Sequence, residues 1–315
     1  MKMNRRSVLI TGGAGFIGSH LCDYFINKDY KVIALDNFMT GNMLNIKHLN
    51  ENSSFEFIEH DICKEININQ KIDYILHFAS PASPKDYLNY PVKTLEIGST
   101  GTQNILKLAQ KNNCTILVAS TSEVYGDPLE HPQKEDYYGN VNPVGPRGVY
   151  DEAKRYLEAI TTAYKTKNNL SVRIARIFNS YGPRMRVDDG RAIPSFINQS
   201  LNNKNFTVYG NGSQTRSFCY IDDTVKCIYK LLKSNYMLPI NIGNNKEHKI
   251  IDVLKTIQKI NPTNNSVEYL DLPVNDPKKR KPDISLANKL LNWSPKINLV
   301  DGLIKTIEYY NNFKK

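Results

Sequence analysis

The stretch SVLITGGAGFIGSHL, residues 7–21, decides the fold of this chain. It places Gly12, Gly15 and Gly18 directly after a short apolar run and at the start of a helical pattern. Gly12 permits a tight turn, Gly15 lets the backbone approach a pyrophosphate, and Gly18 lets helix and strand pack closely. The free N–H groups at the start of the helix attract an anion. This context predicts a dinucleotide-binding loop, whereas the alternative is a glycine-rich structural turn.

Acidic residues at the ends of the next strands indicate which dinucleotide is bound. The second expected strand ends in Asp36, eighteen residues after Gly18. A carboxylate there accepts hydrogen bonds from both ribose hydroxyls and repels a 2′-phosphate, so the sequence predicts NAD rather than NADP. Asp61 and Ile62 follow the third strand, where an acid can reach the adenine amine, although acids at strand ends are also common turn residues.

Short β-branched runs alternate with helical stretches over the first 180 residues. The runs expected to form strands are Ser7–Thr11, Lys31–Asp36, Phe55–Glu59, Asp73–Phe78, Thr115–Ser120 and Ser171–Ile177. Such alternation specifies a parallel sheet with helices on both faces. The sequence therefore predicts the α/β class, with a Rossmann-type doubly wound parallel sheet.

After about residue 179 the pattern changes to shorter pieces. We expect a helix at Ala192–Leu201, a strand at Phe206–Tyr209, a helix at Ile221–Leu232 and a last amphipathic helix from Leu299 to Tyr310. This predicts an NAD-binding domain at residues 1–178 and a smaller C-terminal lobe at residues 179–315, from which the chain can cross back to the first domain.

The composition narrows the class of partner and compartment. The chain has 315 residues, with 41 Lys+Arg against 31 Asp+Glu and a formal net charge of +10, which favours a phosphorylated or polyanionic partner. Its five cysteines are an odd number without a CxxC pair, so we expect neither a disulfide framework nor a metal site, and a cytoplasmic location. No uncharged run approaches the ~20 apolar residues of a membrane span, and no signal peptide is visible, so we expect no membrane partner.

A second group of residues carries proton-transfer chemistry. Tyr150 and Lys154 lie four apart in a helical stretch, so their side chains project from one face. We expect the ammonium to lower the pKa of the phenol, which can then act as general acid and base towards a sugar hydroxyl. Thr121 and Glu123 follow a strand at the carboxyl edge of the sheet, where Thr121 can share the substrate proton and Glu123 can hold or deprotonate a nearby group.

Together these motifs resemble the extended short-chain dehydrogenase/reductase superfamily, whose members remodel nucleotide sugars with tightly held NAD. Longer strings are similar to the UDP-glucuronate decarboxylases, also called UDP-xylose synthases. They are HFASPASP (77–84), GPRGVYDEAKR (145–155), RIFNSYGPRM (176–185), DDGR (188–191), GSQTRSF (212–218) and RKPD (280–283). UDP-glucose 4-epimerases usually have a small apolar residue at the position of Glu123, and dTDP-glucose 4,6-dehydratases have Asp at the position of Ser122. Some GDP-mannose dehydratases share the Ser-Glu pair, so the later strings carry the discrimination.

The resemblance implies an NAD-dependent carboxy-lyase. It converts UDP-glucuronate to UDP-xylose through a 4-keto intermediate, with the bound NAD recycled in each turnover, and it forms a homodimer through helices near residues 92–111 and 150–167. The implied catalytic residues are Thr121, Glu123, Tyr150, Lys154 and Arg280. The implied cofactor site includes Tyr150 and Lys154 as well. Its other members are Gly12, Gly15, Phe16, Ile17, Gly18, Asp36, Asn37, Asp61, Ile62, Ala79, Ser80 and Arg191. The implied substrate site is Asn179, Tyr209, Arg216 and Arg280.

Some alternatives remain open. Another NAD-dependent nucleotide-sugar 4,6-dehydratase or 4-epimerase shares most of these motifs. Glu96 and Gly98 depart from the Lys and Asn usual in relatives. Glu96 either weakens binding of an anionic ligand, indicates a changed substrate, or occupies a solvated helix face. The basic run at residues 278–281 matches a nucleic-acid patch, but it is single, short and without interleaved aromatic residues, so we expect no nucleic-acid partner.

Overall fold

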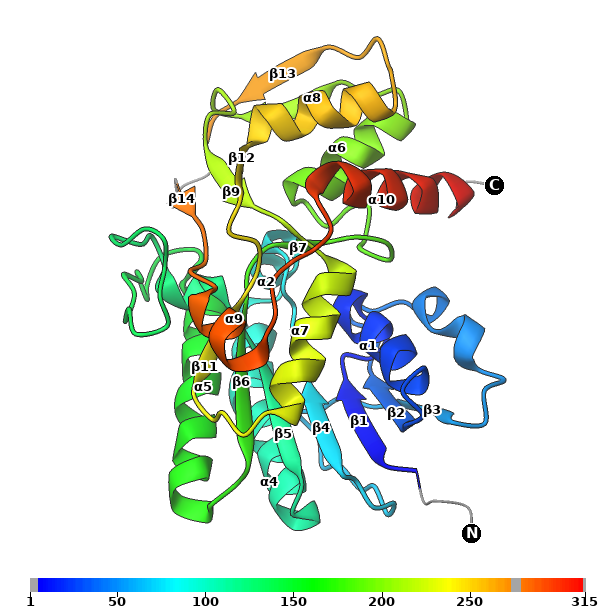
Figure 1. The fold of residues 1–315 in the computed structure, drawn as a ribbon, viewed down its shortest axis with the longest axis vertical. Coiled ribbons are helices and arrows are strands. Elements are labelled where there is room, and N and C mark those ends of the chain that lie inside the picture. The colour runs from blue at the N-terminus through cyan, green and yellow to red at the C-terminus, as the bar shows by residue number, and fades with distance from the viewer. Residues whose placement is uncertain (1–4, 273–278, 314–315) are drawn as a thin grey trace.

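A seven-stranded parallel sheet forms the larger part of the molecule (Figure 1). The computed structural model describes residues 5–272 and 279–313. In spatial order the strands are β3 (Phe55–Glu59), β2 (Lys31–Asp36), β1 (Ser7–Thr11), β4 (Tyr74–His77), β5 (Thr115–Thr121), β6 (Val172–Ile177) and β11 (Pro239–Ile242). The order reverses between β1 and β4, and ligands bind at the carboxyl edge of such a reversal.

Side-chain alternation along the strands explains why helices cover both faces of the sheet. On β1, Val8 and Ile10 join one buried cluster and Leu9 joins another. The first cluster packs under α1 (Phe16–Ile26) and α7 (Ile221–Lys233), and the second under α4 (Thr102–Asn112) and α5 (Gly148–Asn168). Strands buried on both faces read as continuous apolar runs, which confirms the predicted fold class.

A second lobe stands over the carboxyl edge of the sheet, at the top of Figure 1. It contains α6 (Ala192–Leu201), β8 (Phe206–Tyr209), β9 (Thr215–Ser217), β12 (Glu247–Lys249), α8 (Ile250–Ile260), β13 (Val267–Leu270), β14 (Lys279–Arg280) and α10 (Leu299–Phe313). Between these pieces the chain returns to the large sheet through α7 and β11, and β11 pairs with β6. The division into two domains at residue 178 stays a prediction. Elements α7 and β11 lie after that residue in the sequence but pack with the large sheet.

The remaining elements are short and connect the layers. They are η1 (Met43–Asn45), η2 (Lys47–Leu49), α2 (Pro84–Asn89), α3 (Pro91–Glu96), the π-helical turn η3 (Ile97–Gly101), η4 (Ser122–Tyr125), β7 (Ser180–Tyr181), β10 (Cys219–Tyr220) and α9 (Ser285–Leu291). Within residues 5–272 and 279–313, no helix combines the length and apolarity that a bilayer crossing requires.

Candidate active site

One cavity of about 900 Å³ lies between the carboxyl edge of the sheet and the second lobe. Every residue that the sequence singled out for cofactor, substrate or catalysis borders it. These residues are Gly12, Gly15, Phe16, Ile17, Gly18, Asp36, Asn37, Asp61, Ile62, Ala79, Ser80, Thr121, Glu123, Tyr150, Lys154, Asn179, Arg191, Tyr209, Arg216 and Arg280. The fold thus brings segments from both halves of the chain to one space.

The glycine loop adopts a backbone that larger residues cannot follow. Gly12 has a φ of +70°, and a Cβ on Gly18 would lie 2.0 Å from the carbonyl oxygen of Gly12. Gly15 is the N-cap of α1, and the helix opens with Phe16 at the cavity. This arrangement leaves a bare backbone cradle at a helix N-terminus, which suits a pyrophosphate.

Asp36 lies at the end of β2, beside this loop. Its carboxylate accepts hydrogen bonds from the backbone N–H groups of Ala14 at 3.0 Å and Phe38 at 2.9 Å. Burial raises the pKa of this carboxyl, and the backbone N–H groups act in the opposite sense. These bonds hold a buried acid at the cavity wall next to the cradle, so the residues present fit a dinucleotide with a free ribose.

Asp61 and Ile62 border the same cavity. The Asp61 carboxylate accepts from the backbone N–H of Cys63 at 2.9 Å and pairs with Lys93 at 2.9 Å. Although burial acts to raise the pKa of Asp61, these two partners together lower it. Lys93 also contacts Glu96 at 3.4 Å, and that glutamate is more than half exposed. Glu96 therefore occupies a solvated helix face, and it does not border the cavity.

Tyr150 and Lys154 lie on one face of α5, as their spacing predicted, and the structure turns that face towards β5. The Lys154 ammonium donates to the carbonyl oxygen of Ala119 at 3.0 Å and lies 5.7 Å from the centre of the Tyr150 ring. Burial lowers the pKa of Lys154 to about 8. The predicted lowering of the pKa of Tyr150 is not found: burial and the charge of Glu123 raise it, and a hydrogen bond with Thr121 only partly offsets them.

Glu123 sits between two arginines that come from distant segments. Arg147 Nη2 donates to it at 2.6 Å, and Arg280 makes a two-point contact whose longer bond measures 2.8 Å. Burial acts to raise the pKa of Glu123, but Arg280 and Arg147 outweigh it and lower that pKa to about 2. Glu123 is therefore ionised at neutral pH, and it orients both guanidinium groups at the cavity.

Buried donors without partners also border the cavity. Among the described residues they include Asn179 Nδ2 and Arg280 Nε. Arg216 is buried at the same wall, whereas Tyr209 is half exposed at the rim. Arg191 donates to Asp189 at 2.7 Å, and its positive charge acts to lower the pKa of Tyr150. Such donors suit the oxygens of phosphate and carboxylate groups.

Among the cavity residues that the sequence reasoning missed, two contact residues that it had singled out. Arg147 stands three residues before Tyr150 within the string GPRGVYDEAKR, and it is the N-cap of α5. Tyr87 on α2 stacks on the Tyr150 ring, with ring centres 5.1 Å apart and planes 9° apart. The string was a usable signal for Arg147, but nothing local to Tyr87 indicates its contact with a helix more than sixty residues away.

The structure also accounts for two other features noted in the sequence. A Cβ on Gly98 would lie 2.8 Å from the Cβ of Ala153, so glycine lets the π-helical turn approach α5 beside Lys154. In the basic run, Lys278 falls outside the described residues, Arg280 is buried against Glu123, and Lys281 lies 3.8 Å from Glu247. Over residues 5–272 and 279–313, no cluster of three or more His, Cys, Asp or Glu side chains is arranged to hold a metal ion.

Comparisons with known proteins agree with this geometry. The model of the NAD dependent epimerase/dehydratase family matches residues 8–243. UDP-glucuronic acid decarboxylase 1 of Xenopus tropicalis is 46% identical over 98% of this chain and 72% of its own length, and the Arabidopsis thaliana protein of that name is 46% identical over 98% and 70%. The structure of UDP-glucuronic acid 4-epimerase from Bacillus cereus, in complex with UDP-glucuronic acid and NAD, superposes with a TM-score of 0.86 at 31% identity, covering 98% of this chain and 99% of that one.

Proposed function

Because the chain belongs to the NAD dependent epimerase/dehydratase family, and within it to the UDP-glucuronic acid decarboxylases, we propose that this enzyme converts UDP-glucuronate to UDP-xylose and carbon dioxide through a 4-keto intermediate. One observation carries the proposal beyond family membership. Glu123 holds Arg147 and Arg280 at the cavity wall, a few residues along the chain from Thr121. This arrangement offers cations for a sugar carboxylate beside a proton-transfer group.

NAD is the proposed cofactor, held by the glycine loop and by Asp36. The backbone cradle at Gly12, Gly15 and Gly18 would take the pyrophosphate, and the Asp36 carboxylate the ribose hydroxyls. When bound, NAD supplies a positively charged ring and a reversible acceptor for the hydride at C4 of the sugar. A 2′-phosphate would meet the Asp36 carboxylate, so we propose selection against NADP.

Tyr150 is the proposed acid and base at the C4 hydroxyl. Its raised pKa keeps the phenol protonated in the structure described, so the phenolate must be stabilised in the loaded site. Lys154, with a pKa of about 8, is mostly protonated at neutral pH and supplies one positive charge near the ring. Thr121 supplies a hydrogen bond that acts in the same sense. Positive charge entering the cavity then completes the shift towards the phenolate.

Arg280 and Glu123 are proposed to handle the carboxylate and C5. Once C4 is a ketone, the C6 carboxylate lies β to it, and carbon dioxide leaves with its bonding electrons delocalised into an enolate. Tyr150 and Thr121 donate hydrogen bonds to that oxyanion. Arg280 orients the departing carboxylate through its unpartnered Nε, and Glu123 fixes the guanidinium. C5 would then take up one proton, and Tyr150 would return its proton to the C4 oxygen as C4 is reduced, which gives UDP-xylose.

A nucleotide-sugar 4-epimerase or 4,6-dehydratase is the second candidate. The observation in its favour is the superposition on UDP-glucuronic acid 4-epimerase, which shares the fold and is named for the same sugar nucleotide. A 4-epimerase must retain the carboxylate while the 4-ketone exists. Cations near Glu123 would serve the C6 carboxylate in either enzyme, so the arginines do not separate the two activities. The 46% identity to UDP-glucuronic acid decarboxylases, against 31% to the 4-epimerase, favours the decarboxylase.

The deciding experiment mixes the purified protein with UDP-glucuronate and follows carbon dioxide and the nucleotide sugars by mass. Release of one carbon dioxide for each UDP-xylose is expected, with no net NADH. Formation of UDP-galacturonate without carbon dioxide supports the epimerase instead. Accumulation of a UDP-4-keto-pentose with equimolar NADH indicates that the intermediate is released. Turnover of UDP-glucose or GDP-mannose with no turnover of UDP-glucuronate overturns the proposal.

A homodimer is also proposed, through α3, α4 and α5. Leu88, Val92 and Leu95 are exposed near or on α3, and Tyr156 is exposed on α5, where it accepts a hydrogen bond from Gln103 at 2.8 Å. Exposed apolar side chains on neighbouring helices suit an isologous interface. Light scattering of the purified protein should give a molar mass of twice that of the chain. Val92→Glu should reduce the measured mass to that of a single chain. A cytoplasmic location stays a prediction.

A further inference from the structure

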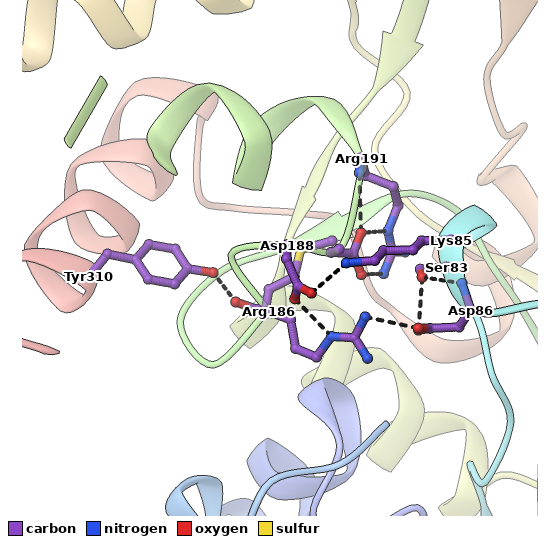
Figure 2. Close-up of polar contacts among 9 residues, drawn as sticks. Ser83, Lys85, Asp86, Arg186, Asp188, Arg191 and Tyr310 are labelled. Atoms are coloured by element: carbon purple, nitrogen blue, oxygen red, sulfur yellow. Dashed lines mark hydrogen bonds and ion pairs between the residues drawn. The ribbon is translucent and has the colours of Figure 1, made fainter. Parts of the chain in front are cut away.

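Two segments that are distant in the sequence meet at the rim of the cavity (Figure 2). One is residues 83–86, at the start of α2, and the other is residues 184–191, which precede α6. Arg186 Nη2 donates to Asp86 Oδ1 at 2.9 Å, and Lys85 Nζ donates to Asp188 Oδ2 at 2.7 Å (Figure 2). These ion pairs tie the sheet side of the cavity to the segment that leads into the second lobe.

Asp86 fixes the first turn of α2 as well as meeting Arg186. Its backbone N–H donates to the Ser83 hydroxyl oxygen at 3.2 Å, and its Oδ2 accepts from that hydroxyl at 2.8 Å. The side chain is buried, with 7% of the residue exposed. Since α2 has only six residues, it is too short to hold its shape alone, and these anchors decide its position.

The next residue along α2 is the one that contacts the proposed acid and base. Tyr87 is 2% exposed, and its ring lies nearly parallel to the ring of Tyr150, 5.1 Å away. A tilt of α2 would therefore move the surface against which the Tyr150 ring rests. In a densely packed interior, such a shift passes directly to the neighbouring side chain.

Arg186, the partner of Asp86, lies in a segment that is anchored to two other helices. Arg184 contacts Asp23 on α1 at 2.6 Å, and the hydroxyl of Tyr310 on α10 donates to the carbonyl oxygen of Met185. Figure 2 shows Tyr310 reaching this segment from the side opposite Asp86. Arg186 therefore projects from a segment that is anchored to two other helices before it meets α2.

We propose that Asp86 and Arg186 are positioning residues for Tyr150. Their ion pair sets the place of α2, and α2 presents the Tyr87 ring that holds the Tyr150 phenol in its working orientation. The inference rests on the proposed function of Tyr150 but concerns residues outside the proton-transfer group. Lys85 and Asp188 form a comparable contact at the same rim, but both are about half exposed and neither touches the Ser83 cap. Asp188 also pairs with Arg186 Nε at 3.3 Å, so the comparison is made by substituting Lys85. They provide a matched comparison.

The experiment compares Arg186→Gln, Arg186→Lys and Lys85→Gln in the full chain. Arg186→Gln should lower kcat about tenfold with KM changed less than about twofold, because a misplaced reacting group slows the chemical step. Arg186→Lys should recover part of the loss, and Lys85→Gln should stay within about twofold of the wild type. A rise in KM with kcat unchanged would overturn the proposal and assign Arg186 to substrate binding. Unchanged kcat and KM in Arg186→Gln would also overturn the proposal.

A readout independent of turnover comes from fluorotyrosine-labelled protein and ¹⁹F NMR. The signal of Tyr150 is assigned by its absence in Tyr150→Phe. Arg186→Gln and Tyr87→Leu should each shift or split the Tyr150 signal. Tyr87→Phe keeps the ring and should leave that signal at its wild-type position. An unchanged signal in a folded Arg186→Gln variant overturns the positioning role. If the wild type does not turn over UDP-glucuronate, the proposed function fails, while this signal still tests the link between Arg186 and Tyr150.

Discussion

The two ends of the cavity are built in different ways. At the end proposed for the dinucleotide, here called the dinucleotide end, Gly12, Gly18 and Asp36 belong to one strand–helix–strand unit, and the proposed fit depends on the backbone itself. At the end proposed for the sugar, here called the sugar end, Glu123 meets Arg280 from 157 positions away, and the proposed fit depends on buried charge. The first end is encoded locally and the second exists only in the folded chain. The substitutions below should therefore act on different properties at the two ends.

Tyr150→Phe should have the largest effect, at the sugar end. Removal of the phenolic oxygen takes away the proposed acid and base, and such groups contribute on the order of 10²–10⁴ in rate. We expect kcat for UDP-xylose formation, followed by mass spectrometry, to fall about 10³-fold. The dinucleotide end should be untouched, so NAD affinity should remain within about twofold. Substantial turnover by the variant would exclude Tyr150 from the proton transfer.

Glu123→Gln should cost both activity and stability. It leaves Arg147 and Arg280 buried beside a neutral amide, and breaking a buried ion pair costs about 3 kcal/mol. The pKa of Glu123 is lowered to about 2 in the folded state, so its contribution is fully present above its ordinary pKa and is lost as the pH falls towards 2. Urea unfolding at pH 7 should show the full difference between variant and wild type, and the difference should shrink at pH 3.

Glu96→Gln is the control for that measurement. Glu96 is more than half exposed and pairs only at 3.4 Å with Lys93, and such surface pairs contribute about 0–1 kcal/mol. Its free energy of unfolding should therefore remain close to the wild-type value at both pH values. If Glu96→Gln and Glu123→Gln changed the free energy of unfolding equally, the position of Glu123 between two arginines would add nothing to stability beyond a surface ion pair.

The sequence predicted the parallel sheet well because each strand is a short apolar run with clear ends. Strands β1, β2 and β3 have the predicted bounds, and β4, β5 and β6 differ by a residue at one or both ends. The strand β11, PINI, was missed because four residues with one buried asparagine give no periodic signal. Helix α8 was also missed, although Ile250, Val253, Leu254 and Ile257 are spaced as one apolar face.

The parts of the site that are built from local segments could be predicted from the sequence, and the parts built from distant segments could not. The glycine loop, Asp36 and the Tyr150–Lys154 pair are local patterns, and the sequence was enough to find them. The raised pKa of Tyr150 was not predictable, because it depends on burial and on the charge of Glu123. Nor was the contact of Tyr87, which depends on how α2 packs on α5. Interactions between distant segments require the fold.

Asp36→Asn tests the dinucleotide end. The amide keeps the shape of the side chain but removes the negative charge beside the glycine loop, so affinity for NAD should fall about tenfold. Affinity for NADP should fall less or rise, since the repulsion of the 2′-phosphate is removed. Calorimetric titration of protein stripped of nucleotide measures both. An unchanged preference for NAD would mean that another residue sets it.

Asp151→Asn should act on stability alone, with the opposite sign to Glu123→Gln. Asp151 follows Tyr150 on α5, and its Oδ1 is buried without a hydrogen-bond partner. Burial and the charge of Glu123 raise its pKa to about 7. The folded state therefore holds a proton that the unfolded state releases near pH 4, and wild-type stability falls as the pH rises from about 4 to 7. The amide removes that slope and should add about 3–4 kcal/mol at pH 8.

The next residue on the helix provides the matched control. Glu152 is partly exposed and contacts Arg155 at 3.5 Å, so Glu152→Gln should change the free energy of unfolding little at any pH. The gain of Asp151→Asn should be absent at pH 4, where the wild-type carboxyl is already protonated in the folded state. A stabilisation that is equal at pH 4 and pH 8 would mean that packing, and not the buried charge, limits stability at the sugar end.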